Sequence, residues 1–134
     1  MFTPTMIIRS FWKVILWIIV ITLLSCLPAR DIIEPSFLKI PNLDKIVHFI
    51  MYSFFSFLLI QALLRYKPAG NHELFLIITI ITSSAYGCLM ELAQLKIFTS
   101  REGDITDLAF NITGAIAGLL IYEIIFQSER KKNY

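Results

Sequence analysis

Polar side chains that could do chemistry collect at one end of the apolar stretches of this chain. They lie where successive stretches would meet on one side of a membrane: Asp44, Lys45, His48, Tyr52, Glu91, Gln94, Arg101, Asp104, Asp107 and Asn111. Polar groups in a bilayer are costly, so each needs a partner or a function. A guanidinium could pair with phosphate, carboxylates and amides could take hydroxyl or amine groups, and an imidazole could move protons.

The first group of these residues opens the second apolar stretch. Asp44, His48 and Tyr52 are spaced i, i+4 and i+8, so one helical face would carry a carboxylate, an imidazole and a phenol from the membrane surface inward. Asp44 could equally be the N-cap of that helix, because Asp is a preferred capping residue. Lys45 could extend outward to water.

The second group closes the third stretch. Glu91 and Gln94 stand one turn apart, and Gly87 lies one turn earlier, so a neighbouring helix could approach closely and meet both side chains. Glu91 would lie roughly 6 Å inside the helix end, where ionisation needs a cation or strong donors. Lys45 and Arg101 are the candidate cations. A Glu that only pairs helices is the alternative interpretation.

The third group opens the fourth stretch. A single helical stripe would contain Asp104, Asp107, Asn111, Gly114 and Gly118. The residues at its outer end are polar, and those deeper in the membrane are small. Asp104 is a plausible N-cap, with Asp107 at the acidic position of a capping box. Asn111 is too deep for a cap and must bond to another helix, its own backbone, water or a ligand. The glycines predict helix packing, within or between chains.

The elements that must position these residues are membrane-spanning helices. Of 134 residues, 57% are hydrophobic and 16% charged, and the mean hydropathy is +0.71. We predict an all-α bundle of four transmembrane helices in a single domain, residues 1–134. The helices are expected near 10–27, 44–64, 73–95 and 105–126. A net charge of +2, dispersed along the chain, gives no reason to expect a nucleic-acid partner.

The basic residues predict the orientation. One side of the bundle would hold seven of them, Arg9, Lys13, Arg65, Lys67, Arg130, Lys131 and Lys132. The other side would hold five, Arg30, Lys39, Lys45, Lys96 and Arg101. The positive-inside rule then favours both termini in the cytoplasm and the polar residues on the extracytoplasmic side of the membrane.

Three ordered motifs are present together in this chain. They are Asp44-Lys45-x-x-His48-Phe49-x-x-Tyr52, Gly87-x-x-x-Glu91-x-x-Gln94, and Arg101-x-x-Asp104-x-x-Asp107-x-x-x-Asn111-x-x-Gly114-x-x-x-Gly118. In this the chain resembles the VanZ-like family of small bacterial membrane proteins, over roughly residues 44–118. That family is named for a protein that lowers susceptibility to the glycopeptide teicoplanin. The resemblance implies a role in the cell envelope.

The first hypothesis for function is binding of a lipid head group or a lipid-linked cell-wall precursor by these polar residues. Arg101 would pair with a phosphate or carboxylate of the ligand. The second is a membrane-embedded enzyme that acts on a lipid-linked substrate, with His48 as general base and Glu91 or Asp107 as acid or metal ligand. The third is a bundle whose polar residues only hold helices together.

A metal or other cofactor is not expected from the sequence. The second histidine, His72, is expected in the opposite loop, and Glu123 is interpreted as part of a solvated helix end on that side. Cys26 and Cys88 lack metal-type spacing, and no nucleophile motif is visible. The oligomeric state is not predicted, and membrane lipids are the expected surroundings.

Overall fold

Four helices make up the part of the chain that the computed structural model describes, residues 4–26, 42–97 and 105–131. They are α1 (Pro4–Cys26), α2 (Leu43–Tyr66), α3 (His72–Ile97) and α4 (Ile105–Lys131). No strand occurs within those ranges. All four helices are long and apolar enough to cross a membrane, with candidate spans of 23, 24, 25 and 22 residues. The predicted all-α bundle of four transmembrane helices is therefore confirmed.

The helix ends differ from the predicted ones for local reasons. Helix α1 begins at Pro4, six residues earlier than expected, because proline suits the first helical position. Helix α4 continues past residue 126 to Lys131. The N-cap of α2 is Asn42, in a left-handed conformation with φ 59°. The alternative placement of Asp44 as the N-cap was therefore wrong, and Asp44 lies in the first turn of the helix.

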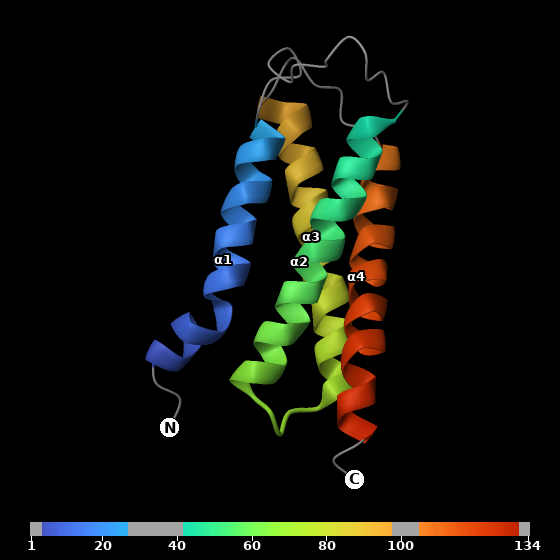
Figure 1. Cartoon of the computed structure of the whole chain (residues 1–134). Helices are drawn as coiled ribbons and strands as arrows, with labels where there is room; N and C mark the ends of the chain where they lie inside the picture. The colour runs from blue at the N-terminus through green and yellow to red at the C-terminus, as the bar shows by residue number, and fades with distance from the viewer. Residues whose placement is uncertain (1–3, 27–41, 98–104, 132–134) are drawn as a thin grey trace.

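Successive helices run antiparallel to one another, so α1 and α3 end at the same end of the bundle where α2 and α4 begin (Figure 1). Helices α2 and α4 lie side by side and pack most extensively. Helix α1 lies at the edge of the bundle and is the least enclosed of the four spans. The start of α1 and the end of α4 lie at the same end of the bundle (Figure 1).

Glycines permit the closest helix contacts. A Cβ at Gly114 of α4 would collide with the backbone carbonyl of Phe49 on α2, and one at Gly118 would collide with that of Ser53. The two backbones therefore meet along a seam that a larger side chain would open. On α3, a Cβ at Gly87 would lie 3.1 Å from the Cβ of Asn111. Gly87 thus lets Asn111 of α4 approach α3.

Apolar side chains fill the space on either side of this seam. One cluster, which includes Ile21, Met51 and Phe55, joins α1 to α2. A second, which includes Ile60 and Leu119, joins α2, α3 and α4 nearer the chain termini. Many large apolar side chains remain exposed on the outside of the helices. An outward apolar surface of this kind is what lipid solvates.

Candidate functional site

Three helices bring polar side chains together near the starts of α2 and α4 and the end of α3. We call His48 and Tyr52 of α2, Glu91 of α3, and Asp107 and Asn111 of α4 the buried polar cluster. Their exposed fractions are 3%, 1%, 6%, 8% and 0%. Residues far apart in sequence share this one buried place because successive helices run in opposite directions (Figure 1).

His48 lies at the centre of the cluster. Its Nδ1 is 2.9 Å from Oδ1 of Asn111 and 3.7 Å from Oε1 of Glu91. An amide oxygen can only accept, so Nδ1 carries the ring proton and donates it to Asn111. In that neutral tautomer Nε2 keeps a lone pair, which is available to a proton or a metal ion.

Lys45 turns toward the cluster instead of extending outward to water. Its Nζ lies 3.7 Å from Oδ1 of Asp107 and 4.0 Å from Oδ2 of Asp44. The Lys45 side chain is 18% exposed, against 49% for Asp44. The ammonium group therefore connects α2 to α4, and Asp44 lies at the surface above the cluster.

Two hydrogen-bond donors in the cluster have no bond within the part of the chain that the structure describes. They are the hydroxyl of Tyr52 and Nδ2 of Asn111. Both side chains lie against Gly87: its missing Cβ would be 3.3 Å from Cε1 of Tyr52 and 3.1 Å from Nδ2 of Asn111. Buried donors without a bond are costly, so they indicate a place where another molecule can accept.

Gln94 faces α1, whereas Glu91 faces α2. Its Nε2 donates to the backbone oxygen of Ser25 at 3.1 Å, and both residues are buried. Carbonyls in the last turn of a helix lack partners within the helix, which explains why Ser25 accepts. The bond to Ser25 was not predicted, because every residue has a backbone carbonyl and the residue type does not show which one accepts.

The structure therefore sorts the predicted site residues into three sets. Lys45, His48, Tyr52, Glu91, Asp107 and Asn111 come together. Asp44 and Gln94 lie beside them, one at the surface and one against α1. Arg101 and Asp104 lie outside the described residues. Gly87, Gly114 and Gly118, which we predicted to pack helices, lie at the close contacts described above.

Metal-binding groups also meet in this cluster. One nitrogen of His48 and one carboxylate oxygen from each of Glu91 and Asp107 lie within 4.8 Å of one another. From the sequence, a divalent metal at His48 and several carboxylates was considered but not expected, because Asp44 is the only carboxylate close to His48 along the chain. Spacing rules for metal ligands work within one element and do not reach across three.

The opposite end of the bundle holds a second histidine and carboxylate. Nε2 of His72 lies 2.9 Å from Oε1 of Glu123, and their side chains are 26% and 19% exposed. His72 is the first residue of α3, so its placement in a loop was wrong. Glu123 lies within α4 and faces His72, so its interpretation as a solvated helix end was also wrong.

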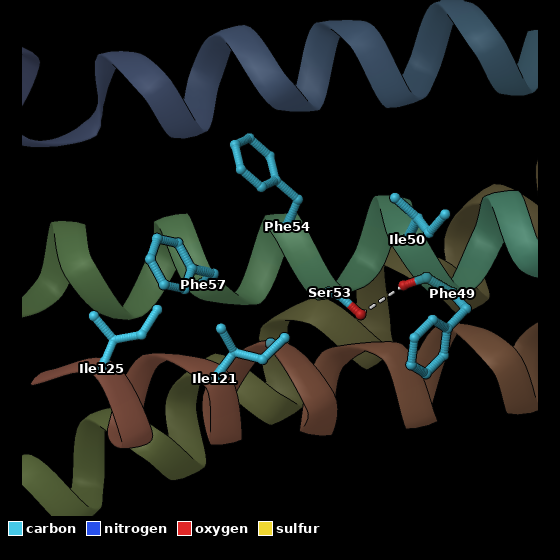
Figure 2. Close-up of a pocket in the computed structure, with 8 residues that line it drawn as sticks. Phe49, Ile50, Ser53, Phe54, Phe57, Ile121 and Ile125 are labelled. Atoms are coloured by element: carbon cyan, nitrogen blue, oxygen red, sulfur yellow. Dashed lines mark hydrogen bonds between the residues drawn. The ribbon is translucent and has the colours of Figure 1, made fainter. Parts of the chain in front are cut away.

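An apolar groove of about 410 Å³ lies on the outer face of α2 and α4 (Figure 2). It is lined by Phe49, Ile50, Ser53, Phe54, Phe57, Gly118, Ile121 and Ile125. Its one hydroxyl, on Ser53, donates to the backbone oxygen of Phe49 at 2.8 Å. The groove offers apolar contact without a free polar group to orient a ligand, so the buried polar cluster remains the candidate site.

Comparison with known proteins gives one match. A family model described as VanZ/LLP1 matches residues 1–126. No curated protein and no solved structure matches the chain. The matched range contains all four candidate membrane spans and every residue of the buried polar cluster.

Proposed function

The chain belongs to the VanZ/LLP1 family, and from this premise we propose that its buried polar cluster binds the head group of a membrane lipid or of a lipid-linked cell-wall precursor. The observation that carries the proposal is the pair of buried donors, on Tyr52 and Asn111, that have no bond within the described residues. A ligand with oxygen acceptors would satisfy both.

The depth of the cluster suits a head group. His48 and Tyr52 are the sixth and tenth residues of α2, about 8 and 14 Å from its first residue at about 1.5 Å per residue. Asn111 is the seventh residue of α4, about 9 Å from its start by the same measure. The cluster thus reaches from the end of the helices into the upper part of the bundle. The head-group layer of a bilayer, about 5–7 Å thick on each side, lies at the entrance of the cluster, so a head group would be drawn in between the helices from there.

The chemistry of the cluster suits a ligand that both accepts and donates. Tyr52, Asn111 and Lys45 supply donors, which fit phosphate, carboxylate or carbonyl oxygens. Glu91 and Asp107 supply acceptors, which fit hydroxyl or amine groups. Phosphorylated lipids and sugar-bearing wall precursors carry both kinds of group.

Arg101 belongs to this proposal as the residue that would pair with the phosphate or carboxylate. Its guanidinium would form two parallel bonds, which a lysine cannot reproduce. Arg101→Lys should therefore retain part of the binding and Arg101→Ala less. The opposite order of the two variants would remove Arg101 from the site.

The proposal places the cluster on the outer side of the bacterial cytoplasmic membrane, with both termini in the cytoplasm. A ligand bound there would be a precursor or lipid of the cell wall. Altering such a target or its accessibility would change susceptibility to glycopeptides such as teicoplanin. The family resemblance and the distribution of basic residues support this placement.

The test compares a deletion strain that carries the wild type, Tyr52→Phe or Asn111→Ala with one that carries His72→Ala. Membrane abundance is measured by blot, and susceptibility to a panel of cell-wall antibiotics, teicoplanin included, is measured in parallel. We expect Tyr52→Phe to behave like the deletion at normal abundance, and His72→Ala to behave like the wild type. Asn111→Ala should also lose the phenotype, but at lower abundance, because it leaves the ring N–H of His48 without its acceptor. Loss of phenotype in Tyr52→Phe that follows loss of abundance would support a purely structural role for the cluster.

A membrane-embedded enzyme is the second candidate, because His48 lies 3.7 Å from the carboxylate of Glu91. An imidazole next to a carboxylate can act as a general base on a hydroxyl or water. This candidate predicts an altered lipid or precursor in extracts of the deletion strain and an absolute requirement for His48. Unaltered precursors in a strain with a clear phenotype would leave binding as the function.

A further inference from the structure

His48, Glu91 and Asp107 form a set of metal donors drawn from three helices. One nitrogen and two carboxylate oxygens lie within 4.8 Å of one another, and the side chains are 3%, 6% and 8% exposed. We propose that these three side chains bind a divalent transition-metal ion of the zinc type. The proposal goes beyond head-group binding, because it assigns the cluster an ion of its own.

The chemistry of the donors fits such an ion. Zinc accepts imidazole nitrogen and carboxylate oxygen, and three protein donors with one open position are its usual catalytic arrangement. A neutral imidazole and two carboxylates together carry two negative charges, which attract a divalent cation. The ammonium of Lys45, 3.7 Å from Asp107, already balances part of this charge and would have to move aside when the ion binds.

The geometry requires only a small contraction. Donors about 2.1 Å from a tetrahedral ion stand about 3.4 Å apart. The present separations are at most 4.8 Å. Carboxylates on Glu and Asp side chains have rotatable bonds that cover such a difference, so the helices can stay in place.

Tyr52 supplies an independent observation. Its hydroxyl is buried and has no hydrogen-bond partner among the described residues. A water or ligand oxygen on the open position of the ion would accept from this hydroxyl. Asn111 adds an orienting contact, because its Oδ1 accepts from Nδ1 of His48 at 2.9 Å and so fixes the orientation of the ring.

The other end of the bundle provides an internal control. His72 and Glu123 are the same residue types in direct contact at 2.9 Å. Within the part of the chain that the structure describes, they are not joined by a third metal donor. Two donors at a partly exposed site bind an ion weakly. A metal site at His48 must therefore have a much higher affinity for the ion than His72 and Glu123 have.

The test uses the full-length protein, purified in detergent and stripped of metal with a chelator. Binding of Zn²⁺ is measured by calorimetry, and binding of Co²⁺ by its visible absorption. We expect one ion per chain in the wild type, and Co²⁺ that excess Zn²⁺ displaces but excess Mg²⁺ does not. His48→Ala, Glu91→Gln and Asp107→Asn should each weaken Zn²⁺ binding at least tenfold, whereas a His72→Ala, Glu123→Gln double variant should bind like the wild type.

A second variant separates the ion site from the fold. Tyr52→Phe keeps all three donors, so it should bind Co²⁺ with an altered absorption spectrum and little change in affinity. Helical content and thermal unfolding without metal show whether each variant is folded. Absence of Zn²⁺ and Co²⁺ binding by the folded wild type would overturn the proposal, as would equal loss of binding in the control double variant. Metal binding is measured without any envelope ligand, so this proposal and the proposed function fail separately.

Discussion

The two ends of the bundle each hold a histidine opposite a carboxylate, and they differ in how completely the protein encloses them. His72 and Glu123 form one short contact at 2.9 Å, with 26% and 19% of their side chains exposed. His48 meets Asn111 and Glu91 at once and is 3% exposed. The first arrangement is a single contact between two side chains, and Nδ1 of His72 also has no hydrogen bond within the described residues.

The buried polar cluster holds more hydrogen-bonding groups than it pairs with one another. Tyr52 and Asn111 each keep a donor without a bond in the described part of the chain. A polar contact that only held two helices together would need just two side chains, as His72 and Glu123 provide at the other end of the bundle. The comparison therefore favours a structural role for the pair at His72 and supports the proposal that the cluster at His48 binds a ligand. Four substitutions test it, from the largest expected effect on stability to the smallest.

Gly118→Leu should destroy the seam on which both ends depend. The new side chain would collide with the backbone of Ser53 and with the Ser56 hydroxyl, and overpacking of this kind costs about 1–3 kcal/mol or more. We expect the largest loss of thermal stability in detergent and a strong fall in membrane abundance. Ala109→Leu, which adds similar bulk to an exposed position of the same helix, should be tolerated. Equal stability of the two variants would show that the seam is wider than described.

Asn111→Leu should destabilise the cluster end alone. It removes the acceptor of His48 Nδ1 and leaves that ring N–H buried, at an expected cost of about 1–3 kcal/mol in the free energy of unfolding. Chemical denaturation followed by circular dichroism measures the change. A cost near zero would mean either that Nδ1 of His48 donates to another acceptor, such as Glu91 at 3.7 Å, or that Nδ1 carries no proton.

Glu123→Gln should have a smaller effect at the other end. The amide keeps a hydrogen bond to His72, and the site is partly exposed, so a cost of about 0.5 kcal/mol is expected in the same denaturation experiment. Antibiotic susceptibility of the strain should not change. A loss of phenotype at normal abundance would give this end a function and remove the contrast.

Tyr52→Phe should leave stability within about 0.5 kcal/mol of the wild type, or raise it, because it deletes a buried hydroxyl that makes no bond in the described residues. Function should be lost all the same, because the ligand would lose a donor. Denaturation and the susceptibility panel are read together. A fall of more than about 1 kcal/mol would show that the hydroxyl already serves the fold.

Much of this fold could be predicted from sequence because apolar length and helical spacing are local properties. Four spans follow from the long runs without charge, and the stripe from Asp107 to Gly118 follows from spacing along one helix. Both can be read without knowing which helices touch. The same reasoning placed His48 and Tyr52 on one face.

Contacts between helices could not be predicted in the same way. The spacing gave no sign that Gln94 donates to the backbone of Ser25, because a carbonyl belongs to every residue. The pairing of His72 with Glu123 was also missed, because the two are 51 positions apart and each looked like an exposed residue at the end of an element. Lys45 was expected to reach water, whereas the structure turns it toward Asp107.

The close seam between α2 and α4 has a consequence for how the protein is made. Helices leave the ribosome in order, so α2 reaches the membrane before α4 does. Until then His48 lacks its acceptor on Asn111, and Lys45 lacks its carboxylate on Asp107. The nascent chain must hold those polar groups at the mouth of the insertion machinery or near the lipid surface. Assembly is thus completed by the last helix to be synthesised, and a chain truncated before Gly114 would be left with an unfinished bundle for quality-control proteases to remove.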